Sequence, residues 1–289
     1  MSPREGRAAL FVGPLIFVVL ILGALYFAKH LDRHAEAEGF GLIETNRIAL
    51  DLEGGAAGWA TWLDPAWAEM LHGRLASIED FPADDASGVA RVVAALNEFS
   101  FIEELGTPRV IWPDGLEVPL RLRRPLACIA YEGRFYSVAV DWQAEAGPRG
   151  VILPGGALTP PAFRGAFLPV IGGIKGPLAS VWLEDPALLG ALSIADSMWS
   201  DLAPEAAHGL GRFVIDATRD AETSVEEPGT RLELEGGRRI YFGRSPYLQA
   251  PGELPAETKW ANLAKALALD GDWDRLDLRW DTPEIHYRQ

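Results

Sequence analysis

The sequence of 289 residues contains one cysteine, Cys128, and three methionines. A single cysteine excludes an intramolecular disulfide and a metal site built from several thiolates. Its neighbours, residues 126–131, are largely apolar, which favours a buried structural thiol over a reactive one. The sequence alone leaves both alternatives open.

Positive charge is also scarce. The chain has 26 Lys and Arg against 41 Asp and Glu, a formal net charge of -15 and a pI of about 4.8. An acidic surface repels phosphate backbones, so no nucleic-acid partner is expected. Hydrophobic residues make up 48% and charged residues 23%, which predicts a folded core rather than disorder.

Enzyme motifs are absent from the sequence: there is no HExxH, no GxSxG and no GxxxxGK. An acidic run contains Asp216, Asp220, Glu222, Glu226 and Glu227. This run predicts a solvated loop, and a carboxylate pair for acid–base catalysis is the alternative. We therefore expect no enzymatic activity, no cofactor and no metal site.

One long stretch, residues 8–28 (AALFVGPLIFVVLILGALYFA), carries no charge. Roughly 20 apolar residues in a helix span a bilayer core. The stretch is longer than the roughly 7–15 apolar residues of a signal peptide, and no clean A-x-A site follows it. The sequence thus predicts a short tail over 1–7, a transmembrane helix over 8–28 and a polar stalk over 29–45. Basic residues on the two sides are nearly balanced and do not decide the orientation.

Residues 46–130 predict a small domain with the order strand, helix, helix, strand, strand. A strand is expected over 47–52, a first helix after Asp64-Pro65 and a second near residues 84–87. The expected buried stripes are Ala66, Trp67, Met70, Leu71 and Leu75 in the first helix and Val89, Val92, Val93 and Leu96 in the second. Residues 116–122 alternate as in a half-buried strand, and Pro119 favours an edge position or pairing on one side.

Residues 131–289 predict a mainly antiparallel β domain with flanking helices. Strands are expected over 134–141 and 150–154, a loop over 159–176 and a helix after Asp185-Pro186. Further strands are expected over 212–217, 230–235, 238–242, 275–280 and 284–287, with a hairpin at Gly236-Gly237 and a helix over 256–269. The predicted fold class is therefore α+β, preceded by the transmembrane helix.

Five segments carry a resemblance to a known family. They are WPDGLEVPLRLRRPLA (112–127), FYSVAVD (135–141), GVILP (150–154), LPVIGG (168–173) and LDLRW (276–280). In this order, behind an N-terminal anchor, they resemble the FtsQ/DivIB family of bacterial cell-division proteins. The first segment resembles the end of that family's POTRA domain, so the resemblance identifies 46–130 as POTRA-like. Arg123, where the family more often has an acidic residue, and the insert 143–149 depart from the pattern.

The resemblance implies a non-enzymatic, bitopic scaffold of the division complex. The C-terminal domain would lie outside the cytoplasmic (inner) membrane at the division site, with residues 8–28 in the bilayer. The implied partners are FtsB/DivIC-like and FtsL-like single-pass proteins and other components of the divisome. Alternatives are a POTRA-containing protein of secretion or outer-membrane assembly and a membrane-anchored cell-wall enzyme.

The resemblance also implies that the last strands bind these partners. A terminal strand can present free backbone groups to a partner segment. Trp280 and Tyr287 are of the type enriched in binding hot spots, and Arg279 and Arg288 could meet acidic partner residues. A purely structural Trp280 with a fraying C-terminus is the alternative. The predicted partner-binding residues are Leu278, Arg279, Trp280, Glu284, His286 and Tyr287.

Overall fold

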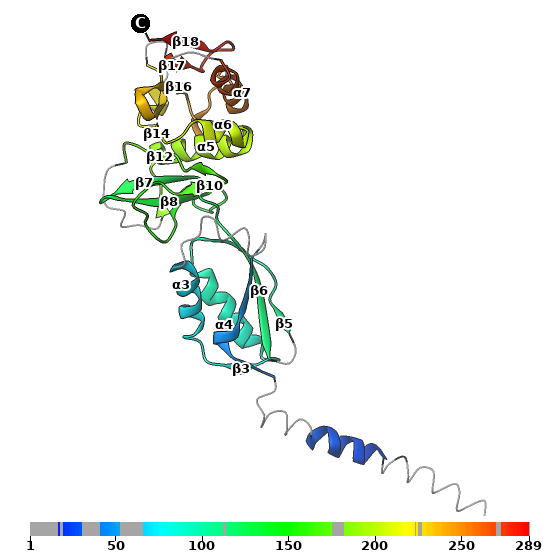
Figure 1. Cartoon of the computed structure of the whole chain (residues 1–289). Coiled ribbons are helices and arrows are strands. Elements are labelled where there is room, and N and C mark those ends of the chain that lie inside the picture. The colour runs from blue at the N-terminus through cyan, green and yellow to red at the C-terminus, as the bar shows by residue number, and fades with distance from the viewer. Residues whose placement is uncertain are drawn as a thin grey trace, which may run out of the picture. The chain divides into compact units, whose positions relative to one another are not determined.

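The computed structural model of the chain describes residues 17, 20–30, 41–52, 66–111, 114–174, 182–222, 224, 227–269 and 273–288. It contains helices together with a four-stranded and a ten-stranded sheet, which confirms the α+β class (Figure 1). The chain divides into two compact units, the larger of which comprises Leu52–His72, Leu96–Leu105 and Leu120–Gln289.

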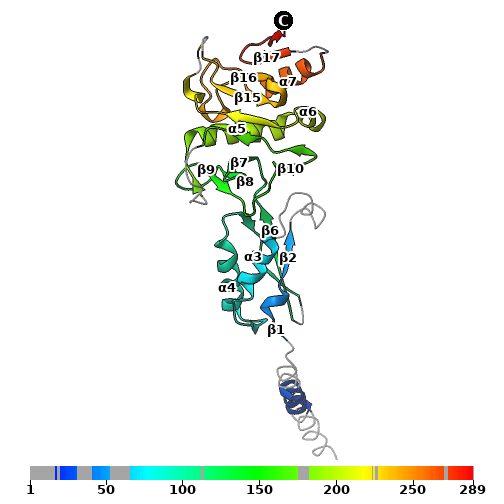
Figure 2. The same cartoon turned by 60° about the vertical axis from the view of Figure 1, so that its left-hand side comes forward.

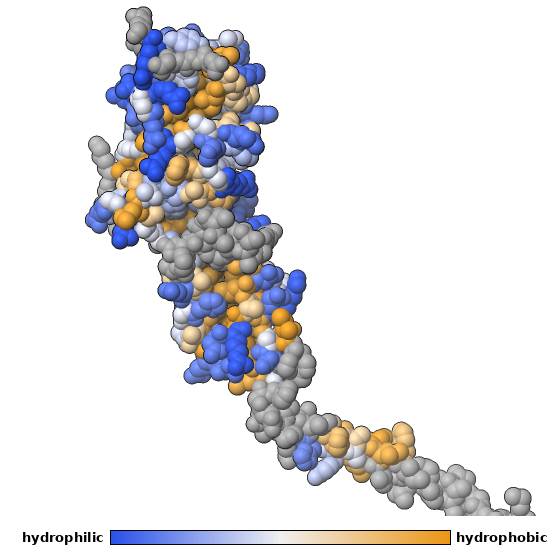
Figure 3. Space-filling model, viewed as in Figure 1, coloured by the Kyte–Doolittle hydropathy of each residue, from blue (hydrophilic) through white to orange (hydrophobic). Residues whose placement is uncertain are grey.

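A helical segment over residues 20–30 overlaps the end of the predicted membrane span. Its large apolar side chains, Leu20, Ile21, Leu22, Leu25, Tyr26 and Phe27, are exposed (Figure 3). Apart from residue 17, the rest of the predicted span, together with residues 1–7 and 31–40, lies outside the described residues. None of the helices that the structure describes is long and apolar enough to cross a membrane.

The elements of the four-stranded sheet begin in the predicted order of strand, helix and helix, but three strands follow the helices where two were predicted. Its elements are β2 (Ala49–Leu52), α3 (Ala66–Leu75), α4 (Ala86–Asn97), β4 (Ile102–Leu105), β5 (Arg109–Ile111) and β6 (Gly115–Leu122). A short antiparallel pair that the sequence did not predict, β1 (Leu42–Ile43) with β3 (Phe81–Pro82), precedes and interrupts this order. Ile43 is fully buried, so the folded part of the chain begins before residue 46.

Pro119 lies in the middle of this sheet and not at its edge, because β6 is flanked by β2 on one side and by β4 and β5 on the other. The Gly106 N–H donates to the Pro119 carbonyl at 2.8 Å. In an antiparallel pair the return bond would come from the N–H that proline lacks. The position that lacks this bond comes directly after Leu105, the last residue of β4. There the chain leaves the sheet, and it joins the sheet again at Arg109 as β5.

The buried stripes of the two helices are close to those predicted. In α3, Trp67, Leu71 and Leu75 are buried, whereas Met70 is 43% exposed. The prediction was wrong for Met70. The buried positions recur every four residues, at Trp67, Leu71 and Leu75, and Met70 lies outside this spacing. In α4, Val92 and Leu96 are fully buried, and Val89 and Val93 are half-buried.

The large sheet has ten strands in the order β13-β9-β8-β7-β12-β14-β15-β16-β17-β18 (Figures 1 and 2). Their bounds in chain order are Ala127–Tyr131 (β7), Arg134–Asp141 (β8), Arg149–Ile152 (β9), Val170–Ile171 (β12), Trp182–Leu183 (β13), Phe213–Asp216 (β14), Thr230–Leu234 (β15), Arg239–Gly243 (β16), Trp273–Asp277 (β17) and Glu284–Tyr287 (β18). Of the nine neighbouring pairs in this order, β7–β12, β12–β14 and β16–β17 are parallel. The sheet is therefore mixed, with antiparallel pairs in the majority.

The segment 159–176, which the sequence predicted to be a loop, contains three short strands. A small hairpin joins β10 (Ala162–Phe163) to β11 (Ala166–Phe167), and β12 occupies the middle of the large sheet. The prediction was wrong because a two-residue strand next to Pro169 and Gly172 carries no periodicity. Its place is decided by β7 and β14, with which it pairs on both sides.

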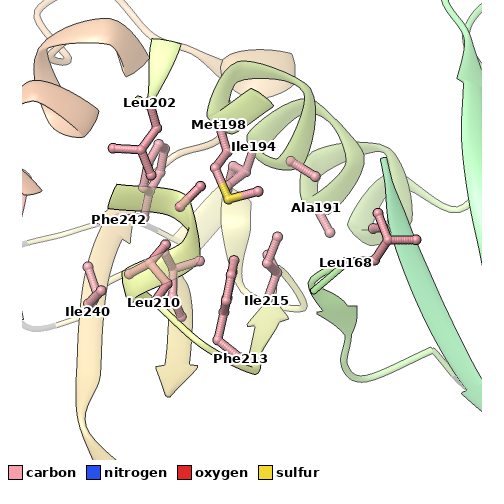
Figure 4. Packing of buried hydrophobic residues seen from close by; sticks show 14 of the residues in the cluster. Leu168, Ala191, Ile194, Met198, Leu202, Leu210, Phe213, Ile215, Ile240 and Phe242 are labelled. Carbon is pink, nitrogen blue, oxygen red and sulfur yellow. The ribbon is translucent and has the colours of Figure 1, made fainter. Parts of the chain in front are cut away.

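Three helices share the hydrophobic core of the large sheet: α5 (Pro186–Asp201), α6 (Pro204–Gly209) and α7 (Ala256–Leu267). Asp185 caps α5 as predicted, since its carboxylate accepts from the N–H groups of Ala187 and Leu188 at 2.8 and 3.1 Å. The predicted stripe Leu188, Leu189, Leu192, Ile194 and Met198 is buried. Figure 4 shows this helix directed at alternate residues of the sheet, among them Phe213, Ile215, Ile240 and Phe242.

Candidate partner-binding edge

The last strand, β18, forms one end of the ten-stranded sheet (Figure 1). It pairs with β17 in antiparallel fashion, from Asp277↔Glu284 to Trp273↔Tyr287. On its other side, no strand among the described residues pairs with it. Backbone N–H and C=O groups along such an edge can template a strand from another chain.

Two of the six predicted binding residues are large aromatic residues that are exposed, one just before β18 in the chain and one at its end. Trp280 is 44% exposed in the connection before β18, and Tyr287 is 52% exposed at the end of the strand. Ile285, on the same face of β18 as Tyr287, packs against the core. The strand is thereby fixed to the sheet while its outer edge and two aromatic side chains remain accessible.

Leu278 is fully buried in the core, and its N–H donates to the Tyr241 carbonyl at 2.9 Å. The prediction of Leu278 as a contact residue is therefore corrected. It assumed one strand from 275 to 280, whereas β17 runs from Trp273 to Asp277 and the chain then turns. The Leu278 side chain packs in the hydrophobic core with Leu276 and is not open to a partner.

His286 and Glu284 lie on the other face of β18, where His286 meets β17. The Arg275 Nη2 atom is 3.0 Å from His286 Nδ1, and His286 Nε2 is 3.9 Å from a Glu284 carboxylate oxygen. A guanidinium only donates, so Nδ1 of His286 is the acceptor in its contact with Arg275. Both predicted residues thus lie at the edge, and His286 also ties the strand to its neighbour.

Arg279 is held inside the chain rather than presented to solvent. Its Nε and Nη2 atoms donate to the Asp277 carboxylate at 3.0 and 2.7 Å. Its Nη1 atom donates to the backbone carbonyls of Ser224 and Glu227, the latter at 3.3 Å. The hydrogen bond to Asp277 raises the pKa of Arg279.

Behind the C-terminal strands lies a buried polar cluster that the sequence analysis missed. Lys259 is 1% exposed and donates to the Glu253 carboxylate at 3.0 Å and to the Arg244 carbonyl at 3.1 Å. Burial lowers the pKa of Lys259, and Glu253 opposes that effect. A signal was present, because Lys259 precedes Leu263 by four residues on the apolar stripe of α7.

Asp220 belongs to the same buried region. It accepts from the Thr230 hydroxyl at 2.9 Å, from the Ser245 N–H at 2.6 Å and from the Ser245 hydroxyl. The sequence placed Asp220 in a solvated acidic loop, and the structure corrects this: the residue is 3% exposed. Within the described part of the chain, no group of three or more His, Cys, Asp or Glu side chains could hold a metal ion.

Comparison with known proteins adds no family assignment. No protein-family model matches the chain, and no curated protein is similar to it in sequence.

Proposed function

We propose that this chain is a membrane-anchored, non-enzymatic scaffold of the bacterial division complex, of the FtsQ/DivIB type. The POTRA-like domain and the β domain would lie on the outer side of the cytoplasmic membrane. The terminal strand β18 would bind an extended segment of an FtsB/DivIC-like or FtsL-like partner.

The observation that carries this proposal is the open edge of β18 with Trp280 and Tyr287 exposed beside it. Backbone hydrogen bonds along an added strand supply affinity, and the two aromatic side chains supply large contact areas at small cost in side-chain entropy. Five ordered segments resemble the FtsQ/DivIB family, which points to the class of partner. The first sheet begins with the strand, helix and helix expected of a POTRA-like domain and continues with three strands, one more than the βααββ order has, so the start of this order supports the proposal.

The exposed apolar helical segment over residues 20–30 supports the anchoring part of the proposal. Several large apolar side chains open to solvent on one helical segment are costly in water. The same side chains would be stable in a bilayer, where the adjoining uncharged residues 8–19 would complete a span.

Capture of partners from solubilised membranes tests the proposal. The tagged full chain is compared with the double variant Trp280→Ala/Tyr287→Ala, with a chain ending at Asp281 and with Leu158→Ala. Leu158 is 77% exposed and is not part of β18, so its variant is the matched control. We expect the full chain and the control to retain small single-pass division proteins. The double variant should retain roughly tenfold less, as hot-spot losses usually do, and the truncated chain none.

Two other results would redirect the assignment. Retention of secretion or outer-membrane assembly factors instead of division proteins would favour the alternative POTRA-containing protein. If the folded full chain retains no envelope protein at all, the scaffold proposal is rejected. The membrane-anchored cell-wall enzyme is then the hypothesis to test.

A further inference from the structure

Arg279 directly precedes the exposed Trp280, yet its own charged group is turned inward. Its side chain is 11% exposed, and that of Asp277, which it binds, is 7% exposed. Three guanidinium nitrogens donate: Nε and Nη2 to Asp277, and Nη1 to the carbonyls of Ser224 and Glu227. One side chain thus joins the end of β17 to the segment that precedes β15.

The aliphatic part of the Arg279 side chain is fixed as well as its guanidinium group. Gly243, at the end of β16, has φ +83°, and a Cβ built there would lie 3.1 Å from Arg279 Cγ and 2.6 Å from a Glu253 carboxylate oxygen. The aliphatic part of Arg279 therefore packs against the backbone of Gly243 with no room between them. Its guanidinium carbon lies 5.6 Å from the centre of the Trp280 ring. A cation at this distance attracts the ring and restricts its rotamers.

We propose that Arg279 is a positioning residue of the β18 edge, which fixes the Trp280 ring in its exposed place and does not itself contact the partner. This inference rests on the proposed function, in which the partner is a division protein whose extended segment binds β18. It also defines the chemistry of the contact. Because the guanidinium of Arg279 already binds Asp277, Ser224 and Glu227, Arg279 does not offer its charge to an acidic partner side chain, whereas an apolar or aromatic one would find the Trp280 face.

The positioning role can be measured without any partner. The full chain, in detergent, is labelled with 5-fluorotryptophan, and the Trp280 resonance is identified by its loss in Trp280→Phe. We expect Arg279→Ala to shift and broaden this resonance while the other nine of the ten tryptophans keep theirs. Arg279→Lys should give an intermediate effect, because an ammonium cannot serve the carboxylate and both carbonyls at once. Arg275→Ala is the control, since Arg275 lies on β17 with Asp277 but its guanidinium contacts His286 of β18 and the Tyr241 ring of β16.

Removing Arg279 alone strands the buried Asp277 carboxylate, which can unfold the chain. The variant Asp277→Asn/Arg279→Ala is therefore measured in parallel. It lacks the stranded charge and should show the same change at Trp280. An unmoved Trp280 resonance in both variants would overturn the inference.

Capture of FtsB/DivIC-like proteins then separates positioning from direct contact. If Arg279 acts through Trp280, Arg279→Ala and Trp280→Ala each weaken capture by a similar factor, and the double variant is no weaker than Trp280→Ala. Independent, multiplying losses with an unmoved resonance would show that Arg279 contacts the partner itself. If the unaltered chain captures no such protein, the proposed function fails, and the fluorine spectra still decide whether Arg279 positions Trp280.

Discussion

At the scale of single residues, the structure decides whether Cys128 is a buried structural thiol or a reactive one. The side chain is fully buried in β7, and its sulfur lies 3.8 Å from the Leu168 carbonyl oxygen. Burial raises the pKa of the thiol from 9.0 to about 12, so almost no thiolate exists near neutral pH. We expect Ellman's reagent at pH 8 to leave the folded chain unlabelled and to label one thiol after unfolding in guanidinium. Cys128→Ala should stay unlabelled in both states, and fast labelling of the folded chain would contradict burial.

The same shift has a consequence for stability. Because the folded-state pKa is raised, the contribution of Cys128 is fully present below pH 9 and is lost as the pH rises from 9 toward 12. The loss is about 1.4 kcal/mol per pH unit in that window. The free energy of unfolding of the unaltered chain should therefore fall faster above pH 9 than that of Cys128→Ala. Parallel pH dependences would show that the thiol titrates alike in both states.

At the scale of elements, two helix glycines provide a matched test of how α4 packs. A Cβ at Gly88 would lie 2.1 Å from the Phe81 ring, whereas a Cβ at Gly73 in α3 would have no atom within 4 Å. Alanine favours a helix at both positions by roughly 1 kcal/mol. We expect Gly73→Ala to stabilise the chain by about that amount. Gly88→Ala should destabilise it by roughly 1–3 kcal/mol, since the Phe81 ring must move.

Urea unfolding of both variants measures the difference. Equal stabilisation by the two substitutions would show that Phe81 does not rest on α4. The comparison also tests whether β3, a strand of two residues without a sequence signal, is part of the packed unit.

Elements with strong local signals were predictable. The pair Asp185-Pro186 predicted the start of α5, and the alternation of residues 116–122 predicted β6. Helix capping and periodicity depend only on residues that are close in the sequence. The place of β12 was not predictable, since it depends on pairing with Cys128–Ile129 and Val214–Ile215 from distant parts of the chain. Among the predicted site residues, Trp280 and Tyr287 are exposed as a binding role requires, whereas the inward orientation of Arg279 was not predicted. Its binding to the segment around Ser224 is a long-range contact that no spacing encodes.

At the scale of the whole molecule, the proposal requires the chain to be held at the membrane by its first 28 residues. The apolar stretch 8–28 predicts that the full chain stays with the membrane pellet after alkaline carbonate extraction, and that a chain beginning at residue 29 does not. Leu22→Arg places a charge within the stretch at a cost of about 3 kcal/mol if it lies near the bilayer centre, and should weaken retention. Lys29→Gln, just beyond the stretch, should leave retention unchanged.

Protease added to spheroplasts tests the orientation of the same chain. Cleavage of the large sheet domain from outside, with the membranes intact, is the expected result, because the partners of a division scaffold are met on that side. Protection of this domain would place β18 in the cytoplasm. Full release of the unaltered chain by carbonate would remove the anchor. Either outcome would leave the open edge of β18 needing a soluble or cytoplasmic partner, and the division scaffold would no longer be the function that this edge serves.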